Sequence, residues 1–156
     1  MLRIGKLTDY ATVILATLAA DRTRLQNAGT LAERTHIAAP TVSKLLKQLQ
    51  RAGLVVSTRG THGGYQLARD PEAISAATIL DALEGPVALT ECSSANNHCG
   101  IENTCSVGRA WQRLNVAIRR SLYEISLAQL AGMDNRAPNM PIERELKQLI
   151  RPKVSA

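Results

Sequence analysis

The 156-residue chain contains no phenylalanine, and aromatic residues make up only 3% of it. Its core must therefore come from leucine, isoleucine, valine and alanine, which favours helices. No stretch approaches the ~18 uncharged apolar residues of a membrane span, so we expect no membrane partner. No small-residue cleavage site follows the interrupted apolar run near the N-terminus, so we expect no signal peptide and a cytoplasmic protein.

Cysteine is scarce and confined to one place. The only three, Cys92, Cys99 and Cys105, lie in ECSSANNHCGIENTCSVG, a polar loop over residues 91–108 that could not build a core. Three thiols cannot form a closed set of disulfides within one chain, and cytoplasmic thiols stay reduced. Metal binding is the leading interpretation, followed by catalysis or redox sensing.

Acidic residues are absent from the whole window 34–69, although the net charge of the chain is only +6. The histidines His36 and His62 lie in the same window. A basic surface fits nucleic acid, an acidic membrane surface or an acidic protein, and this window would concentrate the basic charge. Its six basic residues are Arg34, Lys44, Lys47, Arg51, Arg59 and Arg69.

Helix and turn signals divide residues 1–85 into a helix pair, a hairpin and a further helix. The fold class we predict is mainly α with a small β-hairpin: a winged helix-turn-helix domain plus a long dimerisation helix. The predicted elements are a helix over 8–20, a helix opened by a Thr30–Glu33 capping box, a helix over 41–52 after Pro40 and before Gly53, strands over 54–57 and 65–67, and a helix over 74–85 capped by Ser75 and stopped by Gly85.

The helix over 41–52 has the two faces that a DNA-recognition helix needs. Lys44, Lys47 and Arg51 recur at i, i+3 and i+7, opposite a leucine face, and suit a major groove. Thr41, Ser43 and Lys44 in its first turn would reach base edges of a double-stranded operator.

The hairpin between the two predicted strands has the composition of a DNA-binding wing. Arg59 at its tip would enter a minor groove. Gly60, Gly63 and Gly64 would adopt positive φ and approach phosphates. The alternative interpretation is that the helix is an ordinary solvated surface helix and the hairpin an ordinary hairpin, with no role in DNA binding.

The longest periodic segment runs from residue 107 to residue 131. Its apolar positions are spaced 4, 3, 4, 4 and 3, close to a coiled-coil seam: Val107, Trp111, Leu114, Ile118, Leu122 and Ile125. A continuous helix of this length, about 37 Å, would pair with its own copy or pack back on its own domain. We therefore expect a homodimer, with a DNA-binding domain over 1–85, a cluster-binding loop over 86–106, a dimerisation helix over 107–133 and a flexible tail over 134–156.

Three stretches together carry a family resemblance: LTDYA (7–11), LLKQLQRAGLVVSTRGTHGGYQLARDP (45–71), and the three cysteines just ahead of a long helix. With them the chain resembles the iron–sulfur-sensing winged-helix regulators of the IscR type, closest to regulators of the SUF assembly operon. The resemblance implies a homodimer that reads palindromic operators and represses cluster-assembly genes, not an enzyme. Gly108 and Ser43 depart from the IscR-type pattern, which has a histidine and a glutamate there.

Iron–sulfur clusters usually take four protein ligands, and the loop offers three thiolates. The resemblance implies a cluster, [2Fe-2S] or alternatively [4Fe-4S], on Cys92, Cys99 and Cys105. Nitric-oxide-sensing relatives add an aspartate from the partner's N-terminal helix, and Asp9 in LTDYA matches it. The other options for the open position are His98, Glu91 and Glu102.

Two other chemistries compete with the cluster. Zinc accepts three cysteines plus a histidine or carboxylate, but the C-x₂₋₄-C pairs usual for zinc are absent. A catalytic thiol would need a base, and His98 is the only one nearby. A nitric-oxide- or redox-sensing repressor of the same fold, and a DNA-binding protein with structural zinc, therefore stay open as alternatives.

Overall fold

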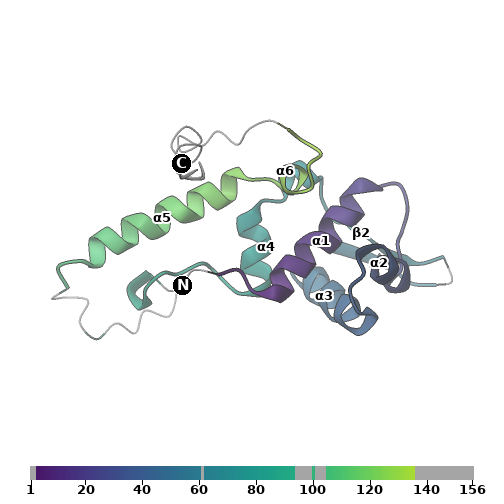
Figure 1. Ribbon diagram of the computed structural model, residues 1–156, viewed down its shortest axis with the longest axis horizontal. Coiled ribbons are helices and arrows are strands. Elements are labelled where there is room, and N and C mark those ends of the chain that lie inside the picture. The colour runs from purple at the N-terminus through teal and green to yellow at the C-terminus, as the bar shows by residue number, and fades with distance from the viewer. Residues whose placement is uncertain (1–2, 61, 94–99, 101–104, 136–156) are drawn as a thin grey trace, which may run out of the picture.

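The computed structural model describes residues 3–60, 62–93, 100 and 105–135 (Figure 1). It confirms a mainly α fold with one antiparallel two-stranded hairpin. The elements are α1 (Lys6–Ala20), α2 (Ala28–Thr35), α3 (Ala39–Arg51), β1 (Val55–Thr58), β2 (Gly64–Leu67), the 3-10 helix η1 (Pro71–Ala73), α4 (Ala76–Leu83), the 3-10 helix η2 (Glu91–Ser93), α5 (Gly108–Glu124) and α6 (Leu127–Leu130).

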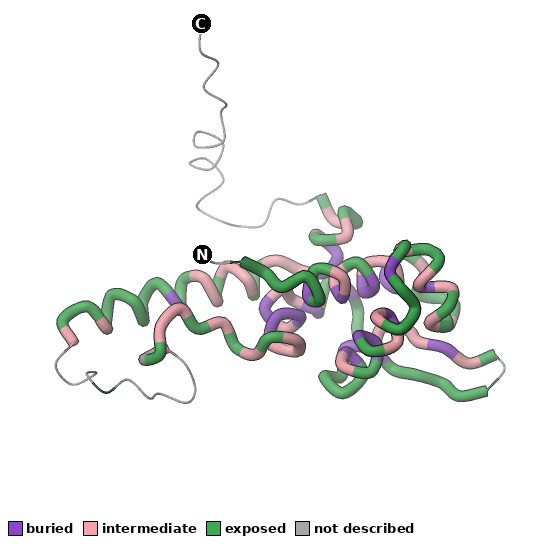
Figure 2. The backbone as a smooth tube through the Cα atoms, turned by 60° about the horizontal axis from the view of Figure 1, so that its bottom comes forward, coloured by how far each residue is buried: buried purple, intermediate pink, exposed green. Residues whose placement is uncertain are grey.

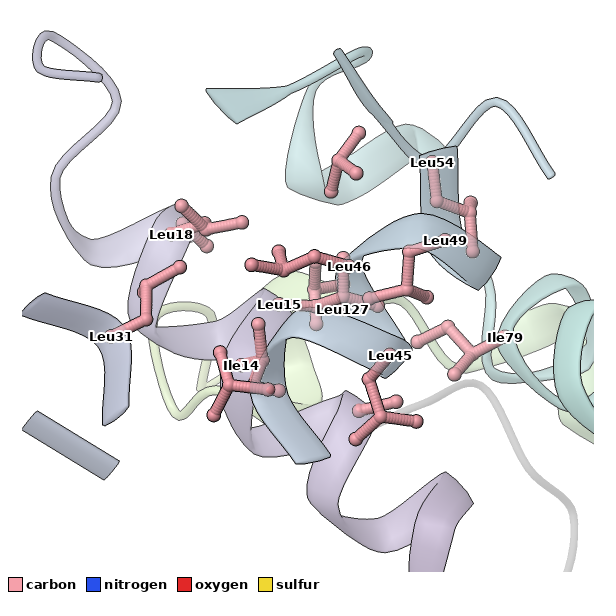
Figure 3. Packing of buried hydrophobic residues seen from close by; sticks show 14 of the residues in the cluster. Ile14, Leu15, Leu18, Leu31, Leu45, Leu46, Leu49, Leu54, Ile79 and Leu127 are labelled. Carbon is pink, nitrogen blue, oxygen red and sulfur yellow. The ribbon is translucent and has the colours of Figure 1, made fainter. Parts of the chain in front are cut away.

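One aliphatic core joins α1, α2, α3, α4 and α6, as the sequence predicts (Figure 3). Its largest side chains are at most 1% exposed, and each stabilises the fold by roughly 1.5–3 kcal/mol. Leu127 of α6 belongs to this core, so the chain returns to the N-terminal domain after α5. The labelled members are Ile14, Leu15, Leu18, Leu31, Leu45, Leu46, Leu49, Leu54, Ile79 and Leu127.

The wing is a four-residue ladder in which Val55 pairs with Leu67 and Thr58 with Gly64. Strand β2 also pairs with Gln26, whose backbone N–H and C=O both form hydrogen bonds with Tyr65. Of the three wing glycines, only Gly60 has a positive φ, at +114°. The prediction of positive φ is therefore wrong for Gly63 and Gly64. They are glycines because a Cβ there would collide with backbone, at 2.2 Å from the oxygen of Thr58 and 2.9 Å from Gln26.

The predicted continuous helix over 107–131 is wrong. Helix α5 ends at Glu124, and Ile125 is extended, with ψ at 117°. The C=O of Ile125 accepts a hydrogen bond from the N–H of Ala76, and the N–H of Leu127 donates to Ile74. Ser126 then starts α6 with a capping box to Gln129. This short bridge redirects the chain into the core, which helical periodicity alone could not reveal.

The predicted capping box between Thr30 and Glu33 is also wrong. Helix α2 begins three residues earlier, and the side chain of Asn27 accepts the N–H of Thr30. Asparagine serves this position as well as threonine does, so the shifted start costs no capping bond.

Helix α5 projects from the winged-helix body and is mostly exposed (Figures 1 and 2). Arg119 fastens it to α4 through an ion pair with Asp81, with 3.0 Å between Nη2 and Oδ2. Hydrogen bonds to Tyr123 and Asp81 raise the pKa of Arg119 above its ordinary value, so the guanidinium of Arg119 stays charged. Among the described residues, no helix is long and apolar enough to cross a membrane.

Candidate DNA interface and cysteine loop

Helix α3 presents its two faces as the sequence predicts. Val42, Leu45, Leu46 and Leu49 are buried in the core. Lys44, Lys47 and Arg51 are exposed on the other side, and Thr41 and Ser43 are half-buried in the first turns. Pro40, Ser43, Lys44, Lys47, Gln48 and Arg51 line one shallow hollow. The structure therefore brings five predicted DNA contacts onto one helix, four of them around this hollow.

A groove between α3 and the wing brings the remaining DNA candidates together. Lys47 lines it from the helix, and Arg59, Gly63 and Gly64 line it from the wing. Gln50 fixes the groove by donating a hydrogen bond from Nε2 to Ser57 Oγ over 2.8 Å. Gln50 is not among the residues predicted from the sequence, although its spacing from Lys47 at i+3 places both on one helix surface.

The basic side chains on this face are available for a polyanion. In the part of the chain that the structure describes, the ion pairs involve Arg22, Arg119 and Arg120, and none involves Lys44, Lys47, Arg51 or Arg59. DNA phosphates would therefore meet these cations without first breaking an internal ion pair.

The cysteine loop is described only in part. Cys99, His98 and Glu102 lie outside the described residues, and so do the side chain of Cys92 and the tail over 136–156. Cys105 is a half-buried free thiol two residues before the N-cap of α5. Glu91 is exposed and opens η2. Within the described residues, no three potential metal ligands come together.

Position 108 faces the sulfur of Cys105. A Cβ built on Gly108 would stand 3.6 Å from Cys105 Sγ, in ordinary contact. A side chain here would therefore project beside the third cysteine, where the IscR-type pattern places its histidine. Glycine offers no ligand atom at this position.

Asp9 lies in the first turn of α1, on the winged-helix body, and its side chain is exposed. Its carboxylate has no recorded hydrogen bond or ion pair among the described residues. The structure therefore leaves Asp9 accessible to a ligand or a second subunit.

The linker ahead of Cys92 is anchored to α5. Asn115 is 6% exposed, the one polar side chain buried on the described α5, and its Oδ1 accepts a hydrogen bond from the N–H of Leu89 at 3.2 Å. Cys92 is only three positions after Leu89, so this bond fixes the direction in which the loop starts. No sequence signal distinguished Asn115, because its burial depends on where the linker packs.

A helix pair, a basic recognition helix and a wing in this order define a winged helix-turn-helix DNA-binding regulator. Residues 4–133 match the Rrf2 model, described as an iron-dependent transcriptional regulator. The chain therefore belongs to the Rrf2 family of transcriptional regulators, which are not enzymes.

Individual relatives confirm the resemblance to IscR-type proteins. The regulator IscR of Vibrio cholerae is 32% identical over 125 residues, which cover 80% of this chain and 71% of that protein. The structure of T. potens IscR is 27% identical with a TM-score of 0.64, over 85% of this chain and 89% of that one. CymR of B. subtilis, described as the global cysteine regulator, is 27% identical with a TM-score of 0.69, over 86% and 100%.

Proposed function

We propose that this protein is a cytoplasmic, homodimeric repressor of iron–sulfur assembly genes whose DNA binding depends on an iron–sulfur cluster. The observation that carries the proposal is the position of the three cysteines. In the sequence they lie between the winged-helix domain, whose basic face has no ion pair among the described residues, and helix α5, which projects from that domain. A group bound there can influence both the DNA-binding unit and the subunit contact.

The donor set fits a cluster. Cys92, Cys99 and Cys105 would supply three thiolates, and Cys105 lies two residues before the N-cap of α5. Asp9 of the second subunit would supply the fourth ligand, because Gly108 cannot and the Asp9 carboxylate is exposed. When bound, the cluster supplies a redox-active group. A carboxylate is harder than a thiolate and binds iron–sulfide units more weakly, which suits a sensor.

The subunit contact is proposed to run along α5. Val107, Trp111 and Leu114 of the predicted seam are 44–55% exposed in the single chain. Large apolar side chains on one stripe of a projecting helix need a partner to leave water. A second copy of α5, related to the first by a two-fold axis, would present the same apolar stripe and could pack against it.

The contacts around α4 connect the cysteine loop to the DNA-binding domain. The Leu89–Asn115 bond and the Asp81–Arg119 pair tie the linker and α5 to each other and to α4. Helix α4 packs against α1 and α3, so a shift of the loop would move the domain that carries the recognition helix. In a dimer, such a shift changes the spacing of the two recognition helices, on which half-site recognition depends.

The alternative is a nitric-oxide- or redox-sensing repressor of the same fold. The exposed Asp9 favours it, because an iron atom held by a carboxylate would be more easily lost or attacked than one held by a thiolate. The further alternative, structural zinc, is distinguished from a cluster by the metal and sulfide content of the purified protein. Anaerobically purified protein should be coloured and contain iron and acid-labile sulfide. Replacing Cys92, Cys99 or Cys105 by Ala should remove both in each case. Colourless protein containing zinc would contradict the proposal.

A further inference from the structure

One carboxylate joins the beginning of α1 to the end of α4. Oε1 of Glu84 accepts a hydrogen bond from the backbone N–H of Gly5 at 2.8 Å and from the Thr8 hydroxyl at 2.5 Å. Gly5 is the N-cap of α1 and has no side chain to cap the helix itself. Helix α1 therefore takes its capping acceptor from a residue 79 positions away in the sequence.

Gly5 and Thr8 both lie against the Glu84 carboxylate. A Cβ at Gly5 would stand 2.7 Å from Oε1 of Glu84, so a larger residue there would displace the end of the Glu84 side chain from this position. Thr8 is 2% exposed, and its buried hydroxyl uses Glu84 as acceptor. A negative charge at the start of a helix also interacts favourably with the helix dipole.

The turn held by Glu84 is the turn that carries Asp9. The N–H groups of Thr8 and Asp9 both donate to the carbonyl oxygen of Gly5, at 3.0 and 3.1 Å. Fixing Gly5 and Thr8 therefore fixes the backbone from which the Asp9 carboxylate projects.

On its other side, Glu84 begins the path to the cysteines. It is the C-cap of α4 and precedes Gly85, whose φ of +84° turns the chain into the linker. The linker is held at Leu89 by Asn115 and reaches Cys92 eight positions after Glu84. A single side chain thus connects the Asp9 turn with the segment entering the cysteine loop of the same subunit.

From these contacts we propose that Glu84 is a positioning residue for the cluster site. It holds the first turn of α1 so that Asp9 can reach the partner's cluster, and it links that turn to the subunit's own cysteine loop. The inference rests on the proposed role of Asp9 as a ligand, and Glu84 itself is not a ligand in it.

The first test uses the metal-free full chain, so that it does not depend on a cluster. Hydrogen–deuterium exchange is followed at the first-turn amides of α1 in wild type, Glu84→Ala, Glu84→Gln and Thr8→Val. Glu84→Ala should speed exchange of the Gly5 amide and its neighbours by about tenfold, the effect of losing a helix cap. Glu84→Gln, which keeps an acceptor oxygen, should restore part of the protection. Glu72→Ala, which alters an exposed acid in η1 outside this network, is the matched control and should change nothing.

The second test follows cluster loss from anaerobically reconstituted dimer after addition of a chelator. Asp9→Ala and Glu84→Ala should both lose the cluster faster than wild type, at similar rates. The double variant should be no faster than Asp9→Ala alone, because Glu84 acts through Asp9. Thr8→Val should show a smaller change in the same direction and covers the case in which Glu84→Ala does not fold.

The outcomes separate the two proposals. If Asp9→Ala accelerates loss while Glu84→Ala and Thr8→Val behave as wild type, Glu84 is only a helix cap and the inference fails. If the double variant loses the cluster faster than either single variant, Glu84 acts independently of Asp9 and the inference again fails. If Asp9→Ala leaves the spectrum and rate unchanged, the Asp9 ligand itself is refuted and the positioning role falls with it.

Discussion

Leu114→Asp should convert the proposed dimer into monomers. Leu114 is 45% exposed in the single chain, so about half of its side chain is left for a partner to bury. Half of the roughly 1.5–3 kcal/mol for a buried leucine is about 1 kcal/mol, and two-fold symmetry doubles it to about 2 kcal/mol. Two carboxylates placed in an apolar seam add several kcal/mol each in desolvation. The total exceeds about 5 kcal/mol, so the dissociation constant should rise more than about 10³-fold.

Val116→Asp is the matched control. Val116 is 65% exposed but lies two positions from Leu114, about 200° around the helix, and so faces away from the seam. Sedimentation velocity at micromolar concentration should show dimers for wild type and Val116→Asp, and monomers for Leu114→Asp. Circular dichroism should confirm that all three are folded. A dimeric Leu114→Asp beside a monomeric Val116→Asp would place the subunit contact on the other face of α5 and refute the reasoning.

The free cations of the DNA face give two further predictions. Lys47→Ala should weaken binding to all DNA sequences about equally. It should reduce the log–log salt slope by about 0.9 per subunit, or about 1.8 for the dimer, because each subunit loses one phosphate contact. Salt titrations by fluorescence anisotropy would measure the slope, and an unchanged slope would remove Lys47 from the interface. Arg59→Ala should weaken A·T-rich sites by about 1–3 kcal/mol more than other sites, because arginine prefers a narrow minor groove, and selection from random DNA would detect the change. An unaltered preference in that variant would exclude the minor-groove role.

Local sequence signals predicted the winged-helix body well. The stripe Val42, Leu45, Leu46 and Leu49 placed α3, and Gly53 and Gly85 marked helix ends where the structure has φ of +68° and +84°. These signals succeeded because each depends on residues within one or two turns. The DNA candidates on α3 followed directly, since helical spacing decides which side chains share a face.

Features that depend on tertiary contacts could not be predicted. The break at Ile125 arises from pairing with residues near Ser75, fifty positions earlier, while the apolar spacing continues through it. The roles of Glu84 and Asn115 come from hydrogen bonds between residues far apart in the sequence. The partners of Glu84 are 76 and 79 positions away, and the partner of Asn115 is 26 positions away. Asn27 caps α2 in place of Thr30, and because both residue types suit an N-cap, residue type alone could not decide between them.

Cluster occupancy is proposed to control DNA binding, and a pair of DNA titrations with and without the cluster tests this most directly. DNA selected from a random pool by anaerobic, cluster-loaded protein is titrated with that preparation, and then with the same preparation after the cluster has been removed by chelation. Iron, sulfide and oligomeric state are measured in both samples. Affinity for the selected DNA should change by at least about fivefold, as expected for an allosteric coupling of about 1–3 kcal/mol, while the protein stays dimeric. Equal affinity in the two samples, with iron and sulfide present only in the first, would contradict it.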